Sequence, residues 1–221
     1  MRLRFGPPPI VRTIDTPWAP RRPLGDVQDE ALHALGLAVA ALEEAEARPW
    51  VTYGTLLGLV REGRLLPNDD DIDLAVSGGA DPARISAAML ARGFVANNEE
   101  RDAEGVIKQK FELGAILIDL FFVRQAGGWW TDLSRAGTYS VLRSTHPPVE
   151  IVRRQYGGLE LPVPAQTEAY LVHCYGPGWR QPVTVWSWFL SPPNAELSLH
   201  WRDLYWFYRQ RRRFLKRLAK A

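Results

Sequence analysis

Residues 68–76 have the sequence Asn-Asp-Asp-Asp-Ile-Asp-Leu-Ala-Val, and the interpretation of the whole chain starts from this stretch. Four aspartates fall within five positions, and an apolar run typical of a β-strand begins inside the cluster. Because successive side chains of a strand point to opposite faces, we expect Asp71 and Asp73 to share one face. Ile72 and Leu74 would share the other and become buried.

Two carboxylates on one face of a strand repel each other and need a neutralising partner. At a separation of about 4 Å the repulsion is roughly 4 kcal/mol for an effective dielectric constant near 20. Carboxylate oxygens favour a divalent cation, above all magnesium, with manganese as the alternative. An exposed acidic turn is the interpretation without a metal. An EF-hand calcium loop is excluded, because its glycine and glutamate positions hold Leu74 and Ala80.

Composition favours an ordinary globular protein. The chain has 221 residues, enough for one well-buried core, and its 46% hydrophobic and 24% charged residues are typical values. The single cysteine, Cys174, excludes an internal disulfide framework and fits a reducing compartment, so we expect a cytoplasmic protein. The sequence has no apolar run long enough to span a membrane and no secretory signal at residues 1–25.

The formal net charge of +2 hides an uneven distribution along the chain. Residues 1–25 carry a net charge of +4 and residues 200–221 a net charge of +7, which leaves −9 on residues 26–199. Nucleic-acid binding depends on clustered Lys and Arg against phosphates. The acidic central part therefore argues against a nucleic-acid partner at the catalytic face.

Three segments are expected: an extended Pro/Arg-rich arm over 1–25, a catalytic domain over 26–182 and a basic helical extension over 183–221. Periodicity and turn residues predict an α+β protein with a mixed sheet. The predicted helices cover 26–47 (capped by Asp26), 55–62, 82–92, 165–174 and 196–220, and the predicted strands cover 50–53, 71–76, 106–112 and 115–123. Residues 124–160 are expected to form irregular hairpins.

Asp119 is the one charged residue in the apolar strand predicted over 115–123. A buried carboxylate costs several kcal/mol unless it is paired or bound to a metal. One interpretation is an ion pair with Lys108, which would lie opposite Asp119 if the turn between the two strands has two or four residues. The other is a third metal ligand beside Asp71 and Asp73.

Phosphate-binding groups are expected around the same place. Gly54 and Thr55 stand where a strand meets a helix, and helix N-termini favour anions. Arg61 falls on the same helix face as Gly54, by the three-to-four-residue rule. Lys108 and Lys110 share a strand face and could neutralise a pyrophosphate. Each of these signals is weak alone, because a common helix start and solvated basic residues would look the same.

Residues 53–61 (Tyr-Gly-Thr-Leu-Leu-Gly-Leu-Val-Arg) and 66–73 (Leu-Pro-Asn-Asp-Asp-Asp-Ile-Asp) resemble the signature of the LicD/fukutin family. The segment Ile118-Asp119-Leu120-Phe121 is similar to a later acidic strand of that family, and residues 161–179 are similar to its closing segment. The resemblance spans roughly residues 28–182. It implies a nucleotidyltransferase-type fold and a phosphotransferase that moves phosphocholine, ribitol phosphate or glycerol phosphate from a CDP-linked donor to a glycan or cell-surface acceptor.

The resulting hypothesis makes Asp71, Asp73 and Asp119 the metal ligands and catalytic residues. An acceptor hydroxyl attacks the distal phosphorus in line, Asp119 helps to deprotonate it, and a nucleoside monophosphate leaves. Two alternatives stay open. One is a nucleotidyltransferase that acts on a small molecule or protein, and the other is a non-catalytic module of the same fold.

Two further features concern partners. The adjacent Trp129 and Trp130 would suit a cation–π pocket for choline, or would pack in a core. The C-terminal helix combines an apolar stripe with many Lys and Arg residues. It is either a docked helix with a solvated basic face or a peripheral contact with the anionic inner face of a membrane, which would suit a lipid-linked glycan acceptor.

Overall fold

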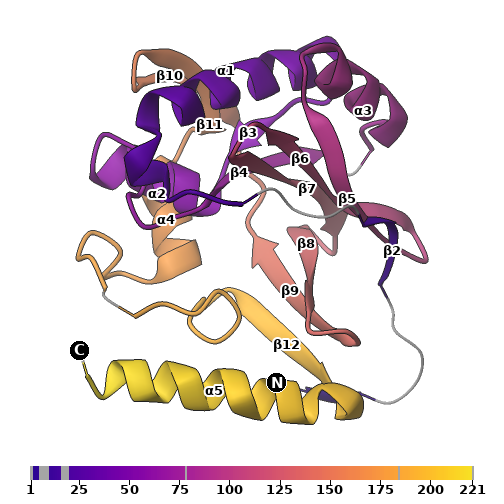
Figure 1. Cartoon of the computed structure of the whole chain (residues 1–221), viewed down its shortest axis with the longest axis vertical. Helices are drawn as coiled ribbons and strands as arrows, with labels where there is room; N and C mark the ends of the chain where they lie inside the picture. Colours follow the sequence, from indigo (N-terminus) through magenta and orange to yellow (C-terminus); the bar gives the residue numbers. More distant parts are fainter. Residues whose placement is uncertain (1, 5–9, 16–19, 78, 184, 221) are drawn as a thin grey trace.

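The computed structural model describes residues 2–4, 10–15, 20–77, 79–183 and 185–220. Over these residues, ten strands form one sheet and two more form a separate hairpin (Figure 1). The main path of the sheet is β1-β12-β9-β8-β7-β6-β5-β2, and β4, which carries β3, pairs with β7. Helices alternate with strands in the first part of the chain, and β5 to β11 then follow one another without a helix between them. The predicted α+β class with a mixed sheet is confirmed.

The elements have the following bounds. The helices are α1 (Gln28–Glu44), α2 (Tyr53–Arg61), α3 (Pro82–Ala91), α4 (Thr167–Tyr175) and α5 (Leu204–Leu218), with 3-10 turns η1 (Leu24–Asp26) and η2 (Trp201–Asp203). The strands up to the middle of the chain are β1 (Arg2–Arg4), β2 (Val11–Asp15), β3 (Trp50–Val51), β4 (Asp71–Ser77), β5 (Val95–Asp102), β6 (Gly105–Leu113) and β7 (Ile116–Ala126). The later strands are β8 (Trp129–Ala136), β9 (Ser140–His146), β10 (Ile151–Tyr156), β11 (Leu159–Pro164) and β12 (Ala195–His200).

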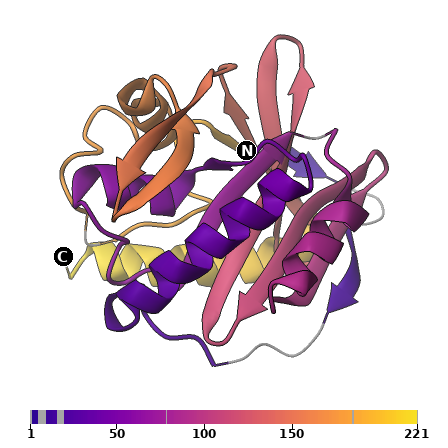
Figure 2. The same cartoon turned by 90° about the horizontal axis from the view of Figure 1, so that it is seen from above.

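The centre of the sheet is the parallel pair β4 and β7. On one face, the apolar side chains of both strands pack in the core beneath α1 and α3. Figure 2 shows these two helices lying over the sheet. Ile72 and Leu74 of β4 are fully buried there, as the alternation of the sequence predicts. The opposite face carries only a small apolar cluster, formed by Trp50, Ala75, Phe121 and Val123. This second face lies away from α1 and α3, and the start of α2 reaches it at Asp73.

The antiparallel pair β6 and β7 differs in register from the prediction. Leu113 pairs with Ile116, so Lys110 lies opposite Asp119 and Lys108 lies opposite Phe121. The predicted pairing of Lys108 with Asp119 is wrong by two residues. A shift by an even number keeps every side chain on its face. Both lysines therefore still point to the face that carries Asp119.

Several predicted boundaries are wrong. Asp26 lies in η1, and Val27 occupies the N-cap position of α1 without a side-chain hydrogen bond. The start of the predicted C-terminal helix is the strand β12, because Leu197 and Leu199 alternate into an apolar cluster. β5 escaped detection because its four consecutive buried residues, 97–100, are all polar.

Residues 124–160 form regular hairpins, β8–β9 and β10–β11, in place of the irregular ones expected. The expected arm over 1–25 contributes β1, which pairs with β12, and β2, which pairs with β5. Residues 1, 5–9 and 16–19 of that arm lie outside the described residues. Among the helices of the described chain, none is both long and apolar enough to cross a membrane.

Asp203 ties the C-terminal segment to the sheet. Its buried carboxylate accepts hydrogen bonds from the backbone N–H groups of Thr138, Tyr139 and Ser140 and from the Ser140 hydroxyl, at 2.7–3.1 Å. Gly137 has a φ of +86°, and a Cβ there would lie 2.9 Å from Asp203 Cγ. The turn between β8 and β9 thus wraps the residue that precedes α5.

Candidate active site

Three carboxylates meet on the face of the sheet that lies opposite α1 and α3. Asp73 of β4 lies directly beside Asp119 of β7 in the parallel ladder, and Asp71 is two residues earlier on β4. Each of the three offers a carboxylate oxygen, and these oxygens all lie within 4.8 Å of one another. Alternation along β4 and the pairing of β4 with β7 are sufficient to bring them together.

The first turn of α2 positions Asp73. The Gly54 N–H donates to Asp73 Oδ2 at 3.0 Å, and the Thr55 hydroxyl oxygen accepts from the Asp73 N–H at 2.8 Å. A Cβ on Gly54 would lie 2.5 Å from Asp69 Oδ2 and 3.3 Å from Asp73 Oδ2. Only glycine therefore lets the helix approach the acidic cluster this closely.

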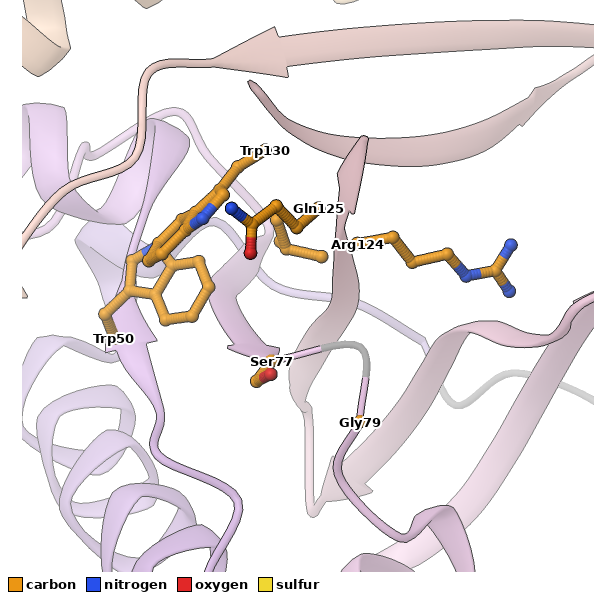
Figure 3. Close-up of a pocket in the computed structure, with 7 residues that line it drawn as sticks. Trp50, Ser77, Gly79, Arg124, Gln125 and Trp130 are labelled. Carbon is orange, nitrogen blue, oxygen red and sulfur yellow. The ribbon is translucent and has the colours of Figure 1, made fainter. Parts of the chain in front are cut away.

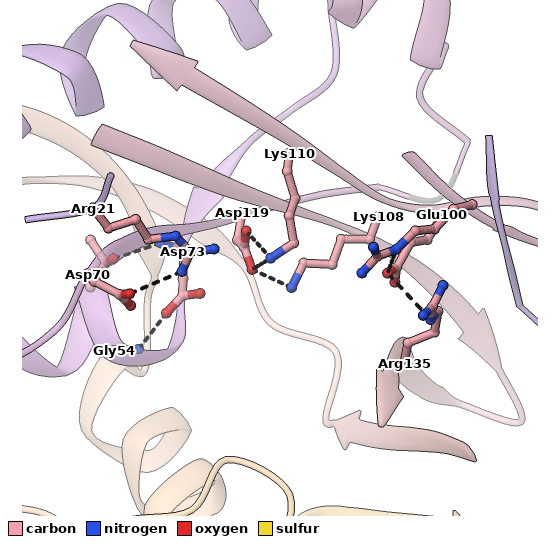
Figure 4. Close-up of polar contacts among 11 residues, drawn as sticks. Arg21, Gly54, Asp70, Asp73, Glu100, Lys108, Lys110, Asp119 and Arg135 are labelled. Atoms are coloured by element: carbon pink, nitrogen blue, oxygen red, sulfur yellow. Dashed lines mark hydrogen bonds and ion pairs between the residues drawn. The ribbon is translucent and has the colours of Figure 1, made fainter. Parts of the chain in front are cut away.

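Two lysines neutralise Asp119. Lys108 makes a short ion pair with Asp119 Oδ2, and Lys110 Nζ donates to the same oxygen at 2.8 Å (Figure 4). Burial alone would raise the pKa of Asp119, but the two ammonium groups outweigh it and lower that pKa to about 2. Lys108 also lies over the ring of Phe121, 4.1 Å from its centroid. Both interpretations of Asp119 thus apply, because it is ion-paired and also lies among the other carboxylates.

Neither Asp71 nor Asp73 makes an ion pair with a residue that the structure describes, and their pKa values shift in the opposite direction. Burial, with the charges of Asp119 and Asp69, raises the pKa of Asp71 to about 8. Burial, with the charges of Asp71 and Asp69, raises the pKa of Asp73 well above its ordinary value. Ionising several neighbouring carboxyl groups together is costly. A cation bound among them makes their ionised forms favourable.

The donor set fits a divalent cation. All three groups present hard carboxylate oxygens, which suit magnesium or manganese. Asp119 Oδ1 is buried and makes no hydrogen bond, although Lys110 Nζ lies 2.8 Å from it. A cation at that oxygen would take the place of the Lys110 ammonium in this ion pair.

Two other aspartates adjoin the cluster. Burial raises the pKa of Asp69, and its carboxylate lies close to Gly54. Asp70 is exposed and its Oδ2 lies 3.1 Å from Arg21 Nη1. Asp69, Asp70 and Asp71 also have carboxylate oxygens within 4.8 Å of one another, but Asp70 turns toward solvent. Asp69 is thus the neighbour that can support the three central ligands.

Arg61 is engaged elsewhere. It follows Gly54 by seven residues on α2, which is roughly 10 Å along the helix axis. Its guanidinium pairs with Glu62 at 2.8 Å and donates to the carbonyl of Trp179 at 3.3 Å. A role in phosphate binding would require Arg61 to give up both contacts.

A buried polar network behind α2 was not predicted from the sequence. The Tyr53 hydroxyl donates to Asp132 Oδ2 at 2.6 Å and lies 2.9 Å from His146 Nε2, which lies 3.0 Å from the same oxygen. Burial and Asp132 raise the pKa of Tyr53, so this hydroxyl keeps its proton. Tyr53 has a φ of +42° and directly precedes Gly54. The network therefore holds the start of α2, although no spacing in the sequence links its members.

The two adjacent tryptophans do not form one pocket. Both belong to strand β8, not to a loop, and successive strand residues face opposite sides. Trp129 stacks on His173, with ring centroids 6.0 Å apart, whereas Trp130 contacts Trp50 at 5.1 Å. Of the two interpretations, a choline pocket shared by Trp129 and Trp130 is thus disfavoured, and Trp130 instead packs against an apolar cluster.

Sequence comparison assigns a family to this site. The profile of the LicD/FKTN/FKRP nucleotidyltransferase domain matches residues 46–166, which is more than half of the chain and includes all three carboxylates. The chain belongs to the LicD/FKTN/FKRP family. The expectation of a nucleotidyltransferase-type domain is confirmed by this match.

Curated relatives point in the same direction. Ribitol-5-phosphate transferase FKTN from Mus musculus, Macaca fascicularis and Homo sapiens is in each case 25% identical over 178 residues, covering 80% of this chain. The aligned part is 39% of those relatives, so this chain spans well under half of their length.

Solved structures show weaker likeness. The crystal structure of ANT(2")-Ia with adenylyl-2"-tobramycin gives a TM-score of 0.44 at 19% identity, over 72% of this chain and 82% of the other. The solution structure of the same antibiotic-resistance factor gives 0.47 at 18% identity, over 72% and 78%.

Proposed function

We propose that this protein is a metal-dependent phosphotransferase that moves a phospho-alcohol, of the ribitol phosphate kind, from a CDP-linked donor to a glycan acceptor. The observation that carries the proposal is the meeting of Asp71, Asp73 and Asp119 at the first turn of α2. Membership of the LicD/FKTN/FKRP family and the similarity to ribitol-5-phosphate transferases support it.

Different residues of the site would bind the cation and the donor's phosphates. A divalent cation bound by Asp71, Asp73 and Asp119 would neutralise charge on the donor's pyrophosphate oxygens. The Thr55 hydroxyl accepts from the Asp73 N–H and still has a proton to donate to a phosphate oxygen. Gly54 lets the first turn of α2 approach the acidic cluster closely, so that its N–H holds the Asp73 carboxylate in place.

Lys108 and Lys110 connect donor binding to proton transfer. While both pair with Asp119, its low pKa makes it a poor base. A pyrophosphate would attract both ammonium groups and release Asp119 to accept the proton of the acceptor hydroxyl. Donor binding would thus prepare Asp119 for the step in which the acceptor attacks phosphorus and CMP leaves.

The acceptor has room on the same face. Ser77 follows Asp73 by four residues, about 13 Å along β4. A cavity of about 320 Å³ lies there, lined by Trp50, Ser77, Gly79, Val123, Arg124, Gln125 and Trp130 (Figure 3). Arg124 points away from the two indoles and pairs with Asp102 at 2.7 Å. Indole faces beside a hydroxyl and an amide suit sugar rings, so we place the acceptor glycan in this cavity.

Product analysis tests the proposal. The protein is incubated with Mg²⁺ and CDP-ribitol, CDP-glycerol or CDP-choline, and CMP release is followed with and without candidate glycans. We expect CMP from one donor and its loss in the Asp71→Asn and Asp73→Asn variants. Pyrophosphate released from a nucleoside triphosphate, with no CMP from any CDP-alcohol, would identify a nucleotidyltransferase instead.

The acceptor cavity has a matched pair of variants. Trp130→Ala removes an indole that lines the cavity, whereas Trp129→Ala removes its exposed neighbour on the opposite side of β8. We expect Trp130→Ala to raise the KM for the glycan at least several-fold while donor affinity stays unchanged, and Trp129→Ala to raise neither. Equal effects of the two variants would remove the glycan from this cavity.

A glycan carried on a lipid would bring the reaction to a membrane surface. We propose a lipid-linked glycan as one form of the acceptor, with α5 as the element that contacts the bilayer. The composition of α5, with many basic residues and exposed aliphatic side chains, supports this placement.

A further inference from the structure

Helix α5 runs along one end of the molecule, beside β12 and far from α1 (Figure 1). It is attached to the domain mainly near its start, where Trp206 and Phe207 pack against the apolar cluster of Ala136, Leu142, Leu197 and Leu199. None of the 15 residues of α5 is buried. Most of its surface is thus open for contact with something other than its own domain.

An apolar row runs along this open surface. Leu204, Tyr208, Leu215 and Leu218 fall within an arc of about 80° on the helix, at 3.6 residues per turn. Their exposed fractions are 47%, 58%, 45% and 46%. Such a row of half-exposed large side chains on one helix marks an interaction surface.

Arg211 falls inside the apolar arc, and a basic row of four further cations lies on the far side of the helix, about 150° from that arc. Arg209, Arg213, Lys216 and Lys220 follow at spacings of four, three and four residues, so they share a second face. These four cations make no ion pair with any residue that the structure describes. They are therefore available for an anionic partner.

Two exposed tryptophans flank the same helix. Trp201 lies in η2, immediately before α5, and is 47% exposed. Trp188 is 48% exposed, and its neighbour Phe189 contacts Trp206 with ring centroids 5.3 Å apart. Tryptophan is enriched where hydrocarbon meets water, because its ring is apolar and its N–H is polar.

We propose that α5 lies in the surface of an anionic lipid bilayer, with the apolar row among the acyl chains and the basic row on the headgroups. A bilayer surface presents apolar and anionic chemistry side by side, as this helix requires. A nucleic acid would leave the leucines exposed.

Vesicle flotation with the full chain tests the proposal without any use of catalytic activity. The probes are vesicles of pure phosphatidylcholine and vesicles with 30% phosphatidylserine, at low and moderate salt. We expect flotation with the anionic vesicles, weakened by salt, and little with the neutral ones. Equal flotation with both vesicle types, or none with either, would overturn the proposal.

Charge variants give the basic row a matched control. The triple variant Arg209→Glu, Arg213→Glu and Lys216→Glu lowers the net charge by six, as does a control triple at the exposed residues Arg22, Arg48 and Arg143. Loss of each basic residue near an anionic surface costs roughly fivefold, and reversal of its charge costs more, so the α5 variant should bind at least about 100-fold more weakly. The control should bind nearly as well as the wild type. Equal losses would mean that net charge, not α5, attracts the vesicles.

Variants in the apolar row test whether a bilayer or a second copy of the chain covers it. Leu215→Ser with Leu218→Ser should abolish flotation even at low salt, whereas Leu90→Ser with Val95→Ser, at equally exposed sites elsewhere, should not. Sedimentation velocity without lipid should show the same mass for both. Conversion of a dimer to a monomer by the α5 substitutions alone would show that a second copy covers this row, and would overturn the proposal.

Discussion

Asp71→Asn should stabilise the metal-free protein at pH 8. Burial and the neighbouring carboxylates raise the pKa of Asp71 to about 8, whereas an unfolded aspartate titrates near 3.9. The folded state then holds a proton that the unfolded state has lost, so the free energy of unfolding falls as the pH rises from about 4 to about 8. Asparagine cannot ionise and escapes this loss.

The size of the effect follows from the shift. About 4 pKa units at 1.36 kcal/mol each would set a ceiling near 5 kcal/mol. Because Asp71 shares its charge with Asp73 and Asp119 and is partly exposed, we expect about 1–3 kcal/mol at pH 8. For a chain of this length that is roughly 3–10 °C in Tm.

Thermal unfolding in EDTA at pH 5 and pH 8 measures this difference. The stabilisation by Asp71→Asn should be small at pH 5 and large at pH 8, while Mg²⁺ should stabilise the wild type at pH 8 and the variant much less. Asp70→Asn is the matched control, because Asp70 is exposed and pairs with Arg21 at the surface. An Asp71→Asn protein that is no more stable than the wild type at pH 8 would refute the electrostatic description of the site.

Two further predictions concern Gly54, which lets α2 approach the site, and Asp203, which attaches the C-terminal segment to the sheet. Gly54→Ala should lower the turnover of the CDP-alcohol at least tenfold with a small change in Tm, because the new Cβ displaces the Asp69 carboxylate. Unchanged turnover would contradict the need for α2 to approach the acidic cluster closely. Asp203→Ala should destabilise the fold by about 3–5 kcal/mol in urea unfolding, because four donors of the β8–β9 turn, two of them buried, lose their acceptor. A cost below about 1 kcal/mol would show that water replaces the carboxylate.

The placement of the three carboxylates could be predicted from the sequence because it depends only on which face of its strand each residue occupies. Alternation along 71–76 places Asp71 and Asp73 on one face, and a single charge in an apolar strand identifies Asp119. The register between β6 and β7 was wrong by two residues, yet both lysines kept their face. A one-residue error would have separated Lys108 and Lys110 from Asp119.

Other parts could not be predicted, since their causes are tertiary. β5 buries polar residues that find partners only in the fold, such as Glu99, which accepts from Gln109 at 2.8 Å. Tyr53, Asp132 and His146 come from three distant segments, and each alone looks like an ordinary surface or core residue. Helical spacing in 196–200 was equally compatible with a strand, and only packing of β12 against β9 decides between them.

The most direct test of the central claim is a titration of the metal-free protein with Mn²⁺, followed by electron paramagnetic resonance. We expect the wild type to bind Mn²⁺ and each of Asp71→Asn, Asp73→Asn and Asp119→Asn to weaken this binding at least tenfold. The Asp70→Asn control should bind Mn²⁺ as tightly as the wild type. Wild-type affinity in the Asp119→Asn variant would show that β7 supplies no ligand, and would contradict a cation shared between β4 and β7.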